Sequence, residues 1–154
     1  MRVPLRVLVA VIGALAVLVL PSTAQARPGT AAGTQVGVQV GGGLECTVYP
    51  YWTYPPVYTN YCSSPRPSYS STIHFRVQAP SPGYTYSWSM TGAPLPSTCT
   101  STSSTCSVAV DNTRNDRFVT AVVQVSGDGQ TSQFTSQGLA VAACPGPTGR
   151  VEFC

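Results

Sequence analysis

Hydrophobic and polar residues alternate along several short stretches of the chain, and each stretch predicts a β-strand. The clearest case is 84–91, where large apolar residues occupy every second position and only Ser or Thr lies between them. In 72–78 the apolar residues Ile73, Phe75 and Val77 share one face, and polar residues share the other. The same alternation predicts a strand at 35–40. The run 118–125 is apolar on both faces for part of its length, which predicts a central strand. Further strands are expected at 107–110 and at 131–143, the last interrupted near Gly138.

Turn signals separate these stretches, and none of them has helical periodicity. The Asp128-Gly129 pair predicts a tight hairpin between 118–125 and 131–143, because both residue types tolerate a positive φ. Several short strands with turns between them indicate an all-β fold, a two-sheet sandwich with short disulfide-closed loops. Its predicted core includes Trp88, Phe75 and Val123.

The first residues form a separate segment that predicts a secretory signal peptide, 1–26. Arg2 and Arg6 precede an apolar run at 7–20, and Ala24-Gln25-Ala26 resembles a cleavage site. A membrane anchor is the alternative, but the apolar run is short for a spanning helix. We expect 27–34 to be a flexible lead-in, 35–154 to be one domain, and the protein to be secreted.

Six cysteines are present in a chain that we expect to be exported, which predicts disulfide bonds in an oxidising compartment. Six cysteines allow fifteen pairings, and joining sequence neighbours is the simplest. Metal binding is not expected, because the chain has one histidine and no C-x-x-C pair. The neighbour pairs are Cys46–Cys62, Cys99–Cys106 and Cys144–Cys154.

The stretch from Cys46 to Cys62 differs most from ordinary framework sequence. It is uncharged and rich in proline and aromatic residues. Aromatic rings bury large areas at low entropic cost, and a disulfide and prolines would order the loop in advance. This predicts a binding loop whose contact with an extracellular protein or a carbohydrate depends little on salt. The alternative is that the rings fold onto the sandwich as a lid. The candidate contact residues are Trp52, Tyr49, Tyr51, Tyr54 and Tyr58.

Catalytic and metal-binding residues are sparse. His74 is the only histidine and falls on the polar face of a predicted strand, which suits a solvated side chain better than a catalytic triad. The acidic and amide residues between 111 and 116, with Asp128, are typical of turns, and calcium binding is the alternative. The chain has 5 acidic residues and a net charge of +3, without a basic stripe for nucleic acid. We expect no enzyme activity, cofactor or metal.

A family resemblance enters at the strand Tyr84-Thr-Tyr-Ser-Trp88, which is followed by the apolar run 118–125 and its Asp-Gly hairpin. This pattern resembles bacterial extracellular immunoglobulin-like domains, the PKD subgroup in particular, over residues 70–143. The chain departs from that subgroup at Trp88-Ser-Met-Thr-Gly92, where the acidic signature is missing, and carries Phe118 at the usual corner tyrosine. Small secreted apoproteins of the neocarzinostatin type are similar in having short disulfide loops. The resemblance implies extracellular recognition or structure.

Together these observations predict a secreted, non-catalytic binding or structural module at the cell exterior. Two alternatives remain open, a protease inhibitor that presents a disulfide-held loop and a small-molecule carrier. A carrier would need a deep apolar cleft between the sheets. The absence of lysine, together with abundant Ala, Gly, Pro and Arg, suggests a bacterial source.

Overall fold

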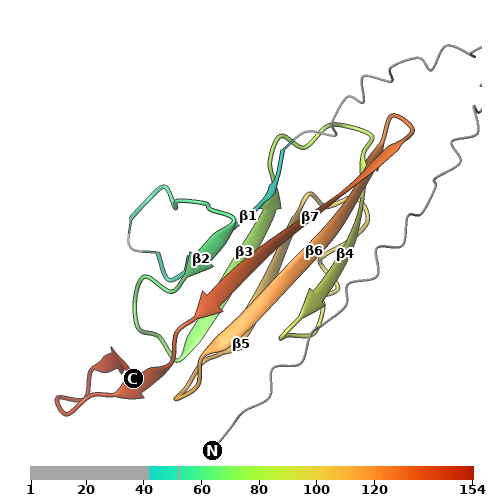
Figure 1. The fold of residues 1–154 in the computed structure, drawn as a ribbon. Coiled ribbons are helices and arrows are strands. Elements are labelled where there is room, and N and C mark those ends of the chain that lie inside the picture. The colour runs from blue at the N-terminus through green and yellow to red at the C-terminus, as the bar shows by residue number, and fades with distance from the viewer. Residues whose placement is uncertain (1–41, 52) are drawn as a thin grey trace, which may run out of the picture. The chain divides into compact units, whose positions relative to one another are not determined.

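The computed structural model describes residues 42–51 and 53–154. This part of the chain contains strands and no helix (Figure 1). The predicted signal peptide, lead-in and strand 35–40 lie outside the described residues. In chain order the strands are β1 Leu44–Tyr49, β2 Tyr61–Ser63, β3 Ser70–Val77, β4 Thr85–Thr91, β5 Thr105–Asp111, β6 Arg117–Gly127, β7 Gln130–Ala140, β8 Ala143–Pro145 and β9 Val151–Phe153.

The strands form two main sheets and one small hairpin, so the all-β fold predicted from the sequence is confirmed. One sheet has the order β1-β3-β5, and the other has the order β2-β7-β6-β4. β2 runs parallel to β7, whereas all other neighbouring strands are antiparallel. β8 and β9 pair with each other, and Ala143 of β8 also forms an isolated parallel bridge with Thr113.

Alternation along the strands supplies one hydrophobic core between the two main sheets. Phe75 of β3, Trp88 of β4 and Val123 of β6, the core residues expected from the sequence, are all buried. Burying a side chain of this kind contributes about 1.5–3 kcal/mol to folding. The polar residues between them face outward, which is why the period-2 pattern was such a clear signal.

The β6–β7 hairpin turns at the predicted Asp-Gly pair. Asp128 and Gly129 have φ angles of 52° and 73°, the left-handed values that a two-residue hairpin turn requires. The Tyr84 hydroxyl donates a 2.8 Å hydrogen bond to the Asp128 carboxylate. This contact ties the end of β4 to the hairpin.

The Cys99–Cys106 loop covers the edge of β4. The Trp88 indole N–H donates to the Ser103 carbonyl over 2.9 Å, and the Tyr86 backbone N–H donates to Ser101 over 2.9 Å. The loop therefore satisfies polar groups of β4 that would otherwise face solvent or the core. The acceptors in this loop are backbone carbonyls of two of its serines. The loop is closed by the disulfide to Cys106, which is buried in β5.

Four strands were missed by the sequence analysis, and one predicted interruption was wrong. β1, β2, β8 and β9 are short and lie beside cysteines or prolines, which had been assigned to loops. β7 runs without a break through Gly138, where an interruption was expected. A side chain at this position has no room, because a Cβ would lie 2.5 Å from Ile73 Cγ2 and 3.4 Å from Cys62 Sγ.

Replacing Gly138 with alanine should therefore destabilise the fold by about 1–3 kcal/mol, since the added methyl group overpacks the core. Chemical denaturation would measure the loss. Gly43→Ala is the matched control, because the nearest atom to a Cβ there is the flexible Gln78 Oε1 at 3.5 Å. Equal stability of both variants would contradict this explanation of Gly138.

Candidate functional site

The disulfide Cys46–Cys62 does not simply close the base of a surface loop, as the sequence suggested. Cys46 lies in β1 and Cys62 in β2, which belong to opposite sheets. Both residues are buried, with exposed fractions of 0% and 8%. The bond therefore joins the two sheets at one side of the sandwich, and the segment that leaves the framework is only 50–60. We call this segment the aromatic loop.

The returning end of the aromatic loop pairs with β1. The Cys46 N–H donates to the Thr59 carbonyl over 2.6 Å, and the Thr59 N–H donates back over 3.0 Å. The Thr59 hydroxyl also donates to the Tyr61 carbonyl. The bonds to Thr59 engage the outer edge of β1 at Cys46, and together with the Thr59–Tyr61 contact they fix the loop at the start of β2.

The tyrosines expected to form a binding surface divide into two groups. Tyr49 and Tyr54 are exposed, at 53% and 90%, whereas Tyr51 and Tyr58 are half-buried. The rings of Tyr49 and Tyr51 meet edge to face with centroids 5.3 Å apart. Trp52, the remaining candidate, lies outside the described residues. Part of the loop is thus exposed to solvent, and part of it packs against the sandwich.

The half-buried tyrosines lie on the outward face of β3. The Tyr51 ring is 6.1 Å from the His74 ring, and the Arg76 guanidinium lies 3.7 Å from the centre of the Tyr58 ring. Arg76 is held in turn by Glu45 of β1 through a 3.0 Å ion pair. The Glu45–Arg76 ion pair, which we call the Arg76 clamp, therefore holds the uncharged loop through the ring of Tyr58. The sequence analysis did not predict this contact.

His74 is half-buried and has one side-chain hydrogen-bond partner. Its Nδ1 lies 2.7 Å from the Ser107 hydroxyl of β5. Desolvation lowers the pKa of His74, so the ring is neutral at neutral pH. Within the described residues no carboxylate hydrogen-bonds His74, and the Ser–His contact therefore lacks the acid that orients a catalytic histidine.

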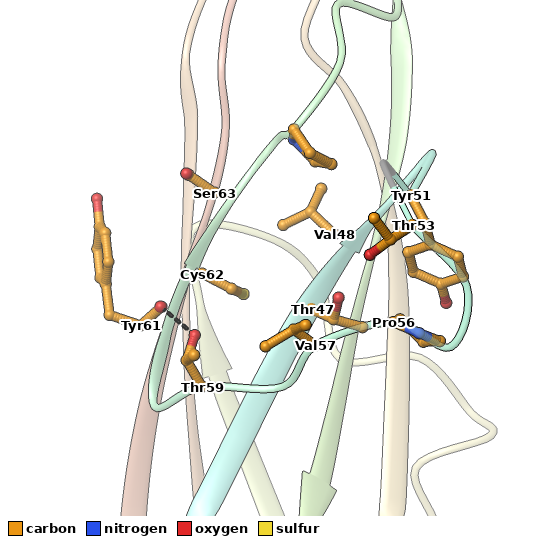
Figure 2. Close-up of a pocket in the computed structure, with 11 residues that line it drawn as sticks. Thr47, Val48, Tyr51, Thr53, Pro56, Val57, Thr59, Tyr61, Cys62 and Ser63 are labelled. Atoms are coloured by element: carbon orange, nitrogen blue, oxygen red, sulfur yellow. Dashed lines mark hydrogen bonds between the residues drawn. The ribbon is translucent and has the colours of Figure 1, made fainter.

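A pocket of about 340 Å³ opens between the aromatic loop, β1 and β2 (Figure 2). Its inner wall comes from Thr47 and Val48 of β1 and from Cys62, and its outer wall comes from the loop residues Pro56 and Val57. None of the residues that line it is charged. Of its hydroxyl-bearing residues the sequence analysis named only Tyr51, because serine and threonine are too common in this chain to stand out. The lining residues with hydroxyl groups are Thr47, Tyr51, Thr53, Thr59, Tyr61 and Ser63.

The turn residues considered for calcium are engaged in backbone hydrogen bonds. An Asp111 carboxylate oxygen accepts from the Thr113 N–H over 2.9 Å, which lowers the pKa of Asp111. An Asp116 oxygen accepts from the Ala142 N–H over 2.6 Å. Across residues 42–51 and 53–154 no cluster of three or more His, Cys, Asp or Glu side chains could hold a metal ion. These contacts are the ordinary chemistry of turns.

Asn112 joins three segments at the end of the sandwich away from the β6–β7 hairpin. Its side chain is fully buried, and its Nδ2 donates to the carbonyls of Ser68 and Val141 over 2.7 and 2.6 Å. Its backbone carbonyl accepts from the Ala143 N–H over 3.0 Å. This residue is therefore part of the framework and does not face a ligand.

Three disulfides indicate an oxidising environment, and the neighbour pairing predicted from the sequence is observed in all three. The described part of the chain has no helix with the length and apolarity needed to cross a membrane. Comparisons with protein-family models, with curated proteins and with solved structures find no match to this chain.

Proposed function

We propose that the protein is a secreted, non-catalytic module that binds a partner at the cell exterior through the aromatic loop. The observation that carries this proposal is the exposure of large apolar side chains on a segment whose ends are both fixed. Tyr54 is 90% exposed and Val57 is 71% exposed, yet the disulfide, the Thr59 pairing and the Arg76 clamp hold the loop around them.

Exposed rings on an ordered segment favour binding for an energetic reason. A binding loop that orders only on contact loses about 0.5–1.5 kcal/mol of affinity for each side chain that it immobilises. Here Tyr51 and Tyr58 already lie on β3 and limit the freedom of the residues between them. Tyr49 and Tyr54 can then contact a partner at a smaller entropic cost.

The strand arrangement supports an immunoglobulin-like interpretation of the sandwich. β1, β3 and β5 occupy one sheet, and β4, β6 and β7 occupy the other. This grouping corresponds to the A-B-E and C-F-G strands of immunoglobulin-like domains, which commonly serve extracellular recognition. The disulfides and the signal-like segment 1–26 support secretion, and the lysine-free composition supports a bacterial source.

The carrier and inhibitor alternatives have less support. The interior between the sheets is filled by side chains such as Phe75, Trp88 and Val123, whereas a carrier needs an apolar cleft there. An inhibitory loop presents an extended backbone to the protease, but the aromatic loop turns Tyr51 and Tyr58 back onto its own sheet.

The proposal predicts that Tyr54→Ala weakens retention on an immobilised partner by about tenfold or more, the usual effect of removing a central aromatic contact. The probes are cellulose, chitin, peptidoglycan and collagen, each tested in pull-down with the full secreted protein. Tyr69→Ala is the matched control, since Tyr69 is exposed but lies outside the aromatic loop. Retention of none of the probes, or equal loss in both variants, would contradict the proposal.

A further inference from the structure

We propose that the pocket beneath the aromatic loop binds a neutral saccharide. This inference rests on the proposed function and specifies its ligand. The central residue is Thr47, which lies on β1 and lines the inner wall of the pocket (Figure 2). The outward tyrosines of the loop would contact the remainder of a longer glycan.

Thr47 is a polar residue whose side chain is largely covered by its neighbours. It is only 5% exposed, and the little exposure that remains is toward the pocket that it lines. Among the described residues its hydroxyl donates to and accepts from no other group, although it is not one of the fully buried polar atoms without a partner. Water or a ligand that enters the pocket can supply this hydrogen bond, and a ligand with several hydroxyl groups can do so while it contacts the apolar walls.

The rest of the lining matches the chemistry of a sugar ring. The Thr53 hydroxyl provides a donor and an acceptor beside that of Thr47, whereas Val48, Pro56 and Val57 provide carbon surface for C–H faces. A charged ligand would enter without a counter-charge, because no Asp, Glu, Arg or His lines the pocket. We therefore infer neutral sugars and exclude uronates or phosphorylated sugars as preferred ligands.

The β1 side of the pocket disfavours a peptide ligand that would bind by adding a strand to the sheet. That mode needs the free backbone groups of a sheet edge. At β1 those groups at Cys46 are already bonded to Thr59. The volume, about 340 Å³, lies at the lower end of the range for ligand pockets, roughly 300–1,000 Å³, which suits one or two sugar rings.

The test is titration of the protein with soluble neutral disaccharides, cellobiose, N,N′-diacetylchitobiose and maltose, followed by calorimetry. At least one should bind, and Thr47→Val should weaken it about tenfold, because valine keeps the shape and removes the hydroxyl. Thr135→Val is the matched control, since Thr135 is an exposed strand residue of the opposite sheet. Thermal unfolding of both variants separates lost binding from lost folding.

Three results would overturn the inference: none of the disaccharides binds, Thr47→Val binds as tightly as the original protein, or glucuronate binds better than glucose. These results do not decide the proposed function. If Tyr54→Ala still weakens retention on collagen while no sugar binds, the aromatic loop is a protein-binding site and the saccharide inference alone is wrong. If the disaccharide bound equally well at low and high salt, that result would support an uncharged site.

Discussion

Replacing both Cys46 and Cys62 with alanine should lower the free energy of unfolding by about 3 kcal/mol, the largest loss expected from any one disulfide here. The bond links residues with a sequence separation of 16 and also joins opposite sheets through two buried cysteines. Its loss therefore adds freedom to the unfolded chain and leaves a gap in the core against Gly138.

Urea denaturation of the double variant would measure this loss. The control replaces Cys144 and Cys154, whose disulfide has a separation of 10 residues but joins only the small β8–β9 hairpin. The hairpin pair should affect global unfolding less, because little of the core depends on that hairpin. Equal losses would show that the position of Cys46–Cys62 between the sheets adds nothing beyond chain entropy.

Asn112→Asp should destabilise the protein by about 3–5 kcal/mol at neutral pH, the usual cost of an uncompensated buried charge. The substitution keeps the shape of the side chain but turns a donor into an acceptor. The Ser68 and Val141 carbonyls, 2.7 and 2.6 Å from Nδ2, would then face a carboxylate oxygen. This arrangement leaves both carbonyls without a donor and adds repulsion.

Stability of this variant should recover in part as the pH falls. Burial raises the pKa of the new carboxyl group in the folded state above its unfolded value, so folding favours the protonated form. The variant regains stability at pH values below the pKa that the carboxyl group has in the unfolded chain. It loses this stability again as the pH rises through the higher pKa that the group has in the folded state. Asn115→Asp is the control, because Asn115 is exposed and donates only one long bond of 3.4 Å. A pH-independent loss at Asn112 would contradict the argument.

The framework was predictable from sequence wherever one face of a strand is apolar and the other polar. β3, β4 and β5 follow this pattern, and β6 was predicted from its run of apolar residues; the predicted ranges of all four overlap the observed strands. β1 has the same alternation at Leu44, Cys46 and Val48, but its cysteine was assigned to a loop. β2 has only three residues, which is too short for a period to be seen.

The candidate site was predictable only in outline. The prolines and tyrosines between two cysteines identified the aromatic loop in the sequence. Their spacing did not predict which of its rings lie on the sheet. Tyr51 and Tyr58 rest on His74 and Arg76 because β1 and β3 are neighbours, a pairing between residues far apart in the chain. The position of Thr47 in the pocket could not be predicted from the sequence, since its burial depends on the return of the loop to β1 at Thr59.

The attachment of the aromatic loop has an evolutionary consequence. Cys46 and Thr59 fix its two ends through a disulfide and backbone bonds, and neither interaction depends on which side chains occupy 53–57. None of those residues belongs to the hydrophobic core. Insertions and substitutions there could change the partner while the sandwich stays the same. The segment 53–57 is thus suited to diversification, and related chains could share this framework while recognising different ligands.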